Sequence, residues 1–226
     1  MTIEASSLSS TITGNKKMVE DTLVRQFAGL STTLVSDNLD RLRGAVGLSP
    51  IHGDRPLCGR AFTVQTRPGD NLFVHLSLDL AEPGDVIVID GGGHETGALM
   101  GEIMMRYAKS RGIAGFVVDG AIRDAGSFKE ADFPCFARSI SHRGPYKNGP
   151  GNVGATVSIG GMTVSPGDII IGDADGVVAV RPDEADTVLE KATAQLAAEQ
   201  RLLAEIAAGT FDRSWLKDLI EAHRGR

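Results

Sequence analysis

Two short apolar runs, each ending in an aspartate and glycine, most constrain how this chain can fold. Residues 86–89 (VIVI) lead into an aspartate and three consecutive glycines, and residues 114–118 (AGFVV) lead into Asp-Gly. Apolar runs of this length, bounded by turn residues, are typical of buried strands. The apolar spacing of residues 96–111 between them predicts an amphipathic helix. The centre of the chain is therefore predicted to form a strand, a helix and a second strand.

The second half of the chain changes pattern, to short apolar segments separated by tight turns. Gly160-Gly161 lies between two of these segments and is a hairpin signal. A β/α centre followed by β hairpins predicts a layered α/β fold. Residues 183–208 have the spacing of a long amphipathic helix, and a shorter helix follows. We expect residues 1–15, rich in Ser and Thr, to form a flexible N-terminal arm, and residues 16–226 to form a single α/β domain with C-terminal helices.

The charge balance and the lack of long apolar stretches argue against several classes of protein. The chain has 23 Lys and Arg against 29 Asp and Glu, a formal net charge of −6. A nucleic-acid groove usually shows a basic patch instead. No stretch approaches the ~18 apolar residues of a transmembrane helix, and the N-terminus lacks the apolar core of a signal peptide. We expect no nucleic-acid partner, no membrane partner and a cytoplasmic location. Cys58 and Cys135 have neither zinc-site nor disulfide-framework spacing.

The turns that follow the two central strands carry the candidate site. In open α/β sheets, ligands bind at the carboxyl ends of the strands. Glycines that lead into a helix leave backbone N–H groups and a partial positive charge for a carboxylate or phosphate. Arg123, after the second strand, can bind a carboxylate through two guanidinium nitrogens. The neighbouring Asp124 offers a hard oxygen ligand for Mg²⁺ or Mn²⁺. The same pair is equally compatible with a solvated ion pair at the start of a helix.

The glycine run after the first strand allows a different interpretation. Gly91-Gly92-Gly93 resembles the loop of a Rossmann-type methyltransferase or dehydrogenase, with Asp119 as a ribose ligand. The spacing is only roughly that of the fingerprint, and hairpins follow instead of further β/α units. His94 fits either a general base or phosphorylated histidine, or a polar loop residue.

A long polar loop follows the central unit. Residues 140–154 are rich in Gly, Pro and Asn and include His142, Arg143 and Lys147. Loops longer than about 12 residues are often functional. We expect this loop to form a lid or a second contact for a carboxylate.

Three motifs together resemble the RraA-like family, over roughly residues 20–200. They are the Gly-Glu helix in ALMGEIMMRYAKSRGIAGF, the turn VVDGAIRD and the segment PGDIIIGDADGVVAV. The family includes class II 4-hydroxy-4-methyl-2-oxoglutarate / 4-carboxy-4-hydroxy-2-oxoadipate aldolases. The resemblance implies a swivelling β/β/α fold of the kind found in phosphohistidine domains. It also implies assembly into a homotrimer or homohexamer.

The resemblance further implies an activity and the residues that perform it. Such aldolases need Mg²⁺ or Mn²⁺, use no Schiff-base lysine, and cleave a small 4-hydroxy-2-oxo acid to pyruvate. The same chemistry would permit oxaloacetate decarboxylation. By resemblance, Arg123 contacts the substrate and stabilises the developing oxyanion, Asp124 ligates the metal, and Glu102 helps to organise metal-bound water. The substrate is held by the backbone of four consecutive residues, Gly101, Glu102, Ile103 and Met104.

One position departs from the aldolase pattern. Aldolase members tend to carry an acidic residue three positions after the Arg-Asp pair, where this chain has Ser127, and its next acid is Glu130. This departure puts the substrate, and aldolase activity itself, in question. RraA itself inhibits ribonuclease E, so the alternative function is a non-catalytic protein regulator of an RNA-degrading enzyme.

Overall fold

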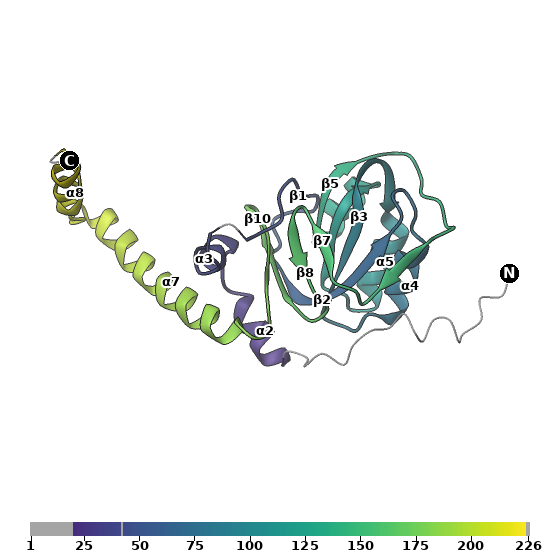
Figure 1. Cartoon of the computed structure of the whole chain (residues 1–226), viewed down its shortest axis with the longest axis horizontal. Helices are drawn as coiled ribbons and strands as arrows, with labels where there is room; N and C mark the ends of the chain where they lie inside the picture. The colour runs from purple at the N-terminus through teal and green to yellow at the C-terminus, as the bar shows by residue number, and fades with distance from the viewer. Residues whose placement is uncertain (1–19, 42, 225–226) are drawn as a thin grey trace.

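The computed structural model describes residues 20–41 and 43–224 of the 226-residue chain. These residues form a body around one large sheet, from which a long C-terminal helix extends (Figure 1). The predicted N-terminal arm, residues 1–15, lies outside the described residues. No helix in the described part of the chain is long and apolar enough to cross a membrane.

The large sheet is mixed, with four parallel strands at its centre. These strands lie in the order β5-β4-β3-β2; their bounds are β2 (Leu57–Thr66), β3 (Asp85–Met100), β4 (Gly115–Ile122) and β5 (Cys135–Ile140). The predicted central pair is confirmed, because Ile87 lies opposite Phe116 in parallel register. Antiparallel strands extend the sheet: β1 (Ser49–Pro50) joins β5, β6 (Gly151–Val153) and β9 (Ile169–Asp173) join β2, and β10 (Gly176–Val180) joins β9.

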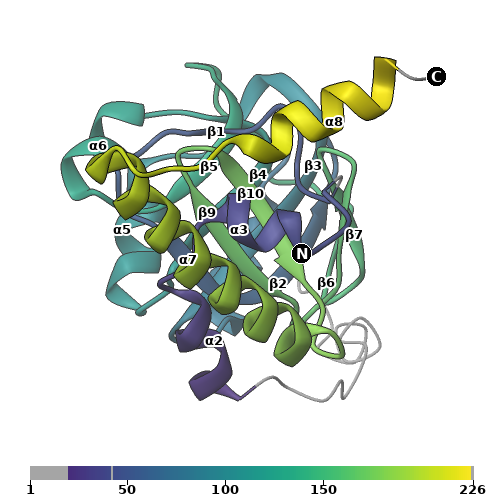
Figure 2. The same ribbon diagram turned by 90° about the vertical axis from the view of Figure 1, so that its left-hand side faces the viewer.

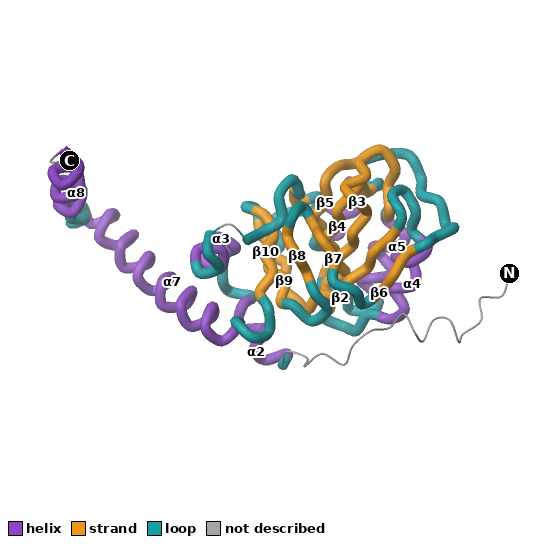
Figure 3. Tube along the Cα trace, in the orientation of Figure 1, coloured by secondary structure: helices purple, strands orange, loops and turns teal. Residues whose placement is uncertain are grey.

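The sheet separates a layer of helices from a layer of strands. The helices α4 (Leu72–Leu80), α5 (Glu102–Ser110) and α6 (Ala125–Ala131) connect the parallel strands and cover one face (Figure 3). The hairpin of β7 (Val157–Ile159) and β8 (Met162–Val164) covers the other face. Strand β3 shows this division, because side chains alternate between the faces of a strand. Its Ile87 and Ile89 pack with the helices, whereas Val86 and Val88 pack with the hairpin. The predicted hairpin and layered α/β fold are confirmed.

A second group of helices packs on β9 and β10. It consists of α2 (Asp21–Phe27), α3 (Thr32–Asp37) and the start of α7 (Ala185–Ala208). The buried residues of α7 are Ala185, Val188 and Ala192, all in its first half. The second half of α7 extends away from the body and leads to α8 (Ser214–Arg224) (Figures 1 and 2).

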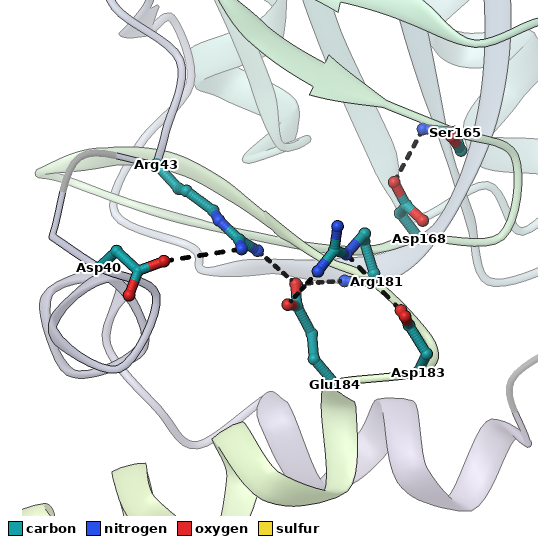
Figure 4. Close-up of polar contacts among 7 residues, drawn as sticks. All are labelled: Asp40, Arg43, Ser165, Asp168, Arg181, Asp183 and Glu184. Carbon is teal, nitrogen blue, oxygen red and sulfur yellow. Dashed lines mark hydrogen bonds and ion pairs between the residues drawn. The ribbon is translucent and has the colours of Figure 1, made fainter.

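An ion-pair network fixes the start of α7. Glu184 precedes this helix and binds two arginines (Figure 4). Arg43 Nη1 lies 2.6 Å from Glu184 Oε1, and Arg181 Nη2 lies 2.8 Å from Glu184 Oε2. The backbone N–H of Arg181 also donates to Glu184 Oε1, at 3.2 Å. Because the Glu184 side chain is only 18% exposed, these pairs are less screened by water than isolated surface pairs are. They orient the helix that extends from the body.

The predicted helix over residues 96–111 is wrong in its first part. Strand β3 continues to Met100, and α5 begins at Glu102. Gly92 and Gly93 have φ of 66° and 68°, and the register of β3 against β4 shifts after Asp90. These glycines therefore form an irregularity within a strand and do not end it. The expectation that they lead directly into a helix is wrong.

Candidate functional site

Two turns meet at the carboxyl edge of the parallel strands. Strand β3 leads into α5 through Gly101, and β4 leads into α6 through Arg123 and Asp124. The backbone N–H of Arg123 donates to the carbonyl of Met100, at 2.9 Å. The backbone N–H of Glu102 donates to Asp124 Oδ2, at 3.0 Å. The structure thus brings together side chains and backbone that the sequence placed 22 residues apart.

Gly101 is required by the close approach of the second turn. Its φ of −160° is extended backbone that any residue adopts, so conformational freedom is not the reason for glycine. A Cβ at this position would lie 2.8 Å from Arg123 Cγ and 3.1 Å from Arg123 Nε, and closer still to Asp124 Oδ2. The lack of a side chain at Gly101 therefore lets the side chains of Arg123 and Asp124 lie directly against the start of α5.

Asp124 adopts a left-handed backbone conformation, with φ 57° and ψ 39°, immediately before α6. This region costs roughly 1–2 kcal/mol for most residues, although Asp tolerates it better than most. Such strain is concentrated at ligand sites and switches. The Asp124 carboxylate is held by the Glu102 N–H and lies 3.7 Å from Arg123 Nε. Both side chains of the Arg123-Asp124 pair are 43% exposed, so a ligand can reach them.

The first turn of α5 supplies backbone donors. The first N–H groups of a helix have no acceptor within the helix, and the helix dipole attracts negative charge there. Asp124 accepts from the first of these, on Glu102. The next two belong to Ile103, whose side chain is exposed, and Met104, which is buried in the core. These two residues can therefore contribute their backbone to a bound carboxylate, as the resemblance implied.

The carboxylate of Glu102 is held by two donors. Arg106 Nε donates to Glu102 Oε1 at 2.6 Å, and the Ser127 hydroxyl donates to the same carboxylate. These bonds, the one from Arg106 first, hold the pKa of Glu102 below its ordinary value. Ser127, which departs from the aldolase pattern, thus contacts the acid of the candidate site.

Residues 141–150 of the predicted loop form a segment beside the site, which we call the strap. One end is anchored by Asp70, which is fully buried. Its carboxylate accepts from the N–H groups of Leu72, Asn148 and Gly149, at 3.0, 2.7 and 3.1 Å. Burial alone would raise the pKa of Asp70, but these three bonds and Arg67 lower it below its ordinary value. The anchor is therefore an ionised group with its partners inside the protein.

The other part of the strap lies against the candidate site. The carbonyl of Arg143 accepts from the N–H of Ala98 in β3, at 2.9 Å. A Cβ on Gly144 would lie 3.2 Å from Arg123 Nη1. The strap therefore passes close to the Arg123 guanidinium, and its expected role as a lid or a second carboxylate contact stays a prediction.

Asp119 and His94 have other surroundings. The Asp119 carboxylate accepts from Arg138 Nε at Oδ1 and from the Gly160 N–H at Oδ2, at 2.9 Å for the latter. One oxygen thus pairs with β5 within the sheet and the other joins the sheet to the hairpin turn, which leaves no support for Asp119 as a ribose ligand. His94 Nε2 lies 3.2 Å from the Thr96 hydroxyl, an arrangement that fits a polar residue at the strand irregularity.

A divalent cation would find a small but suitable donor set at the candidate site. Within residues 20–41 and 43–224, no group of three or more His, Cys, Asp and Glu could enclose a metal ion. Mg²⁺ commonly keeps several waters and is bound by one or two carboxylates together with the substrate. Asp124 is partly exposed and lies beside the first amides of α5, and Glu102 adds a second, ionised carboxylate. These residues fit a metal ion that is bound mainly through water and substrate.

Sequence reasoning missed two residues that hold this site. Arg106 lies four residues after Glu102 on a helix, a spacing that could have indicated their ion pair. The role of Asp70 had no local signal, because its strap partners lie 78 and 79 residues away.

Comparison with known proteins identifies the family. The sequence model of the RraA-like family, described as Aldolase/RraA, matches residues 32–179. The chain belongs to the RraA-like family. A relative from Halalkalibacterium halodurans, named "Putative 4-hydroxy-4-methyl-2-oxoglutarate aldolase", is 44% identical over 170 residues, which cover 75% of this chain and 81% of the relative.

Two solved structures share the fold of this RraA-like chain. An uncharacterized protein from Pseudomonas syringae pv. tomato has a TM-score of 0.78 and 28% identity, and the match covers 86% of this chain and 96% of that one. RraAS2 from Streptomyces coelicolor, described as an unusual member of the RNase ES inhibitor RraA protein family, has a TM-score of 0.74 and 28% identity, over 82% and 97% of the two chains. The predicted family and the mixed α/β fold are therefore confirmed.

Proposed function

We propose that this RraA-like chain is a divalent-metal-dependent aldolase that cleaves 4-hydroxy-2-oxo acids to pyruvate. The observation that carries the proposal is the fixed placement of the Arg123-Asp124 turn against the first amides of α5. A guanidinium, a carboxylate and helix N–H groups lie together there and remain partly exposed. The 44% identity to the relative from Halalkalibacterium halodurans supports the choice of substrate class.

The residues of this chain bind and orient the substrate in the proposed reaction. The N–H groups of Ile103 and Met104 bind the C1 carboxylate. Arg123 donates to the C2 oxygen, where negative charge develops. Mg²⁺ or Mn²⁺, when held by Asp124, supplies Lewis acidity at the 2-oxo group.

The proposed cleavage transfers one proton and one electron pair. The C4 hydroxyl loses its proton and C4 becomes a carbonyl carbon as the C3–C4 bond breaks. The electrons of that bond pass to C3, where conjugation with the C2 carbonyl spreads the charge toward Arg123. C3 then takes up a proton and becomes the methyl group of pyruvate. The ionised carboxylate of Glu102 accepts a hydrogen bond from the water that carries the proton, and so orients it. In oxaloacetate the C3–C4 bond would break in the same way, with C4 leaving as CO₂, the bonding electrons passing to C3, and C3 then taking up a proton to give pyruvate.

The finer properties implied by the family resemblance are also proposals. They are a swivelling β/β/α fold, a single domain over residues 16–226, assembly into a homotrimer or homohexamer, and a cytoplasmic location. The order of hairpin, sheet and helix layers supports the fold type. The partner is a small 2-oxo acid, and not a nucleic acid or a membrane.

The second candidate function is a non-catalytic regulator of an RNA-degrading enzyme. The likeness to RraAS2, which is described as a member of the RNase ES inhibitor family, favours it. This function would require stable association with such an enzyme and no metal-dependent turnover.

Release of pyruvate tests the proposed function. The purified protein is offered 4-hydroxy-4-methyl-2-oxoglutarate, 4-carboxy-4-hydroxy-2-oxoadipate and oxaloacetate, each with Mg²⁺ and with EDTA, and pyruvate is measured through lactate dehydrogenase. We expect turnover that EDTA and Asp124→Ala both abolish. Absence of turnover with every substrate and metal would contradict the proposal and favour the regulator.

A further inference from the structure

Asn71 is a buried residue that contacts three segments around the candidate site, although the proposed reaction does not use it. It directly precedes α4, and only 2% of it is exposed. Its side-chain Nδ2 donates to the carbonyl of Leu99 in β3 at 2.9 Å, and to the sulfur of Met104 in α5 at 3.4 Å. Its backbone N–H donates to the carbonyl of Tyr146 in the strap, at 2.9 Å. One residue thus joins β3, α5 and the strap.

The side chain of Asn71 takes the place of a strand beside the end of β3. The pairing of β2 with β3 ends at Asp90, whereas the pairing of β3 with β4 continues to Met100. The Met100 carbonyl accepts from the N–H of Arg123, on the β4 side. Because successive carbonyls of a strand point to opposite sides, the Leu99 carbonyl faces the side where β2 no longer pairs. Asn71 supplies the donor that a neighbouring strand would otherwise supply there.

Three strand-to-helix turns are consequently linked in series. The turn before α4 binds the turn before α5 through Asn71 and Leu99. The turn before α5 accepts from Arg123 and donates to Asp124 in the turn before α6. The middle turn leads into the first amides of α5, which bind the substrate carboxylate in the proposed function. Arg123 and Asp124 hold this turn from one side, and Asn71 holds it from the other.

Stability alone does not explain an asparagine at this position. Its other side-chain atom, Oδ1, is buried and has no hydrogen-bond partner within residues 20–41 and 43–224. An unpaired buried acceptor costs at least as much free energy as one hydrogen bond contributes. The gain from Nδ2 and the cost of Oδ1 therefore largely cancel. The benefit of Asn71 lies in the position that its Nδ2 imposes on Leu99.

We propose that Asn71 is a positioning residue for the carboxylate-binding amides of Ile103 and Met104. By fixing the Leu99 carbonyl just before α5, it sets the direction of these amides relative to Arg123. The inference rests on the proposed function and adds to it a residue that acts on binding of the C1 carboxylate through the backbone. Because that carboxylate is bound in both the ground state and the transition state, loss of Asn71 should weaken substrate binding and leave the chemical step unchanged.

Asn71→Leu tests the inference, because leucine has a similar size and shape but no side-chain donor. Pyruvate is titrated calorimetrically in the presence of Mg²⁺, and kcat and KM are measured for pyruvate release from 4-hydroxy-4-methyl-2-oxoglutarate. We expect the Kd for pyruvate and the KM each to rise about 10-fold, the effect of weakening a charge-assisted hydrogen bond. We expect kcat to stay within about twofold. Asn71→Asp, which keeps the shape and also lacks the N–H donors, should change the same constants in the same direction.

Asn38 provides a matched control elsewhere in the fold. Its Nδ2 also donates to a backbone carbonyl, that of Leu34 in α3, at 2.9 Å, and it donates to Gln195 Oε1 in α7, at 2.9 Å. Both partners belong to the helices that pack on β9 and β10. Asn38 therefore joins elements as Asn71 does, but these elements do not form the candidate site. We expect Asn38→Leu to leave Kd, KM and kcat within about twofold of the wild type.

The separate constants distinguish positioning from a merely structural role. Partial unfolding would lower kcat and leave KM and the Kd for pyruvate unchanged, and this result would overturn the inference. Unchanged constants in both Asn71 variants would also overturn it and leave the proposed function standing. Failure of both variants to fold, measured by thermal unfolding, would overturn it as well, because Asn71 would then serve the fold and not the amides. If the wild-type protein neither binds nor releases pyruvate, the proposed function fails and the inference fails with it.

Discussion

Substitution of Gly101 by alanine tests whether the packing of two turns creates the candidate site. The added methyl carbon would lie 2.8 Å from Arg123 Cγ and 3.1 Å from Arg123 Nε, whereas ordinary contacts begin at 3.4 Å. The side chains of Arg123 and Asp124 must therefore shift away from the start of α5 by several tenths of an ångström or more. A displacement approaching 1 Å at a reacting centre costs about 100-fold in rate, which corresponds to about 2.7 kcal/mol of transition-state stabilisation. We expect kcat/KM for pyruvate release to fall by about this factor.

The same substitution is expected to affect stability much less. The φ of −160° at Gly101 is accessible to alanine without strain, and the main loss is the hydrogen bond from Glu102 to Asp124. A hydrogen bond to a charged group contributes about 1.5 kcal/mol or somewhat more, so Tm should fall by only about 5 °C. Gly126→Ala is the matched control, because a Cβ there meets nothing within 4 Å. Full activity of Gly101→Ala with an unchanged Tm would refute the reasoning, as would an equal loss of activity in Gly126→Ala.

Three further predictions concern the metal, the Asp119–Arg138 ion pair and the thiols. Asp124→Asn is expected to lower metal-dependent turnover about 100-fold or more, since metal catalysis contributes several kcal/mol; activity that persists and still depends on Mg²⁺ would contradict this role. Asp119→Asn removes the negative charge that pairs with Arg138, and the Asp119 side chain is only 8% exposed. We therefore expect the free energy of unfolding in urea to fall by about 3–5 kcal/mol. A loss under about 1 kcal/mol, the size expected for a surface ion pair, would contradict this reasoning. Burial raises the pKa of Cys58 to about 11 and also raises that of Cys135. The unfolded thiols, with ordinary values, therefore lose protons first as pH rises. The stability that the protonated Cys58 thiol contributes to the folded state is therefore complete below about pH 9 and is lost toward pH 11. The urea concentration at the unfolding midpoint should fall over that pH range in the wild type, and should fall less in Cys58→Ala.

The parts of the structure that sequence could predict are those decided locally. The run of residues 86–89 is apolar at every position, and the structure pairs it with the run of residues 114–118 in a parallel sheet. Arg123 and Asp124 come five and six residues after the second run, just past the end of β4, so the topology of parallel strands was enough to place them at the carboxyl edge. The hairpin was likewise marked by its own Gly160-Gly161 turn.

The boundary between β3 and α5 shows where local reasoning failed. Three consecutive glycines indicate a turn, and residues 96–111 have a helical spacing of apolar residues. The structure instead keeps residues 96–100 in the strand, because Ala98 and Met100 pair with β4 beyond the irregularity. Gly91 is needed for close packing, since a Cβ there would lie 2.9 Å from the Asp119 carbonyl oxygen of the neighbouring strand. Tertiary pairing thus overrode the local signal.

The position of the strap could not be predicted from the sequence, for a different reason. The composition of residues 140–154 indicated a loop, but the loop's position depends on Asp70. The carboxylate of Asp70 accepts hydrogen bonds from the N–H groups of Asn148 and Gly149, 78 and 79 residues further along the chain. An aspartate in Gly69-Asp70-Asn71 looks locally like any helix-start residue, and its carboxylate does accept a hydrogen bond from the Leu72 N–H at the start of α4. Only the folded sheet shows that the same carboxylate also binds the strap.

The net charge of the chain does not decide whether its candidate site can bind an anion, which limits what composition could exclude. A formal charge of −6 argues against an extended basic surface for nucleic acid. The candidate site, however, gathers Arg123 and the first amides of α5 beside the carboxylates of Asp124 and Glu102. Interactions at such short range exceed the repulsion from distant carboxylates, because exposed charges more than about 10 Å apart are largely screened at physiological salt. Net charge therefore affects how fast an anionic ligand arrives, whereas its binding depends on the few groups that the two turns hold in place.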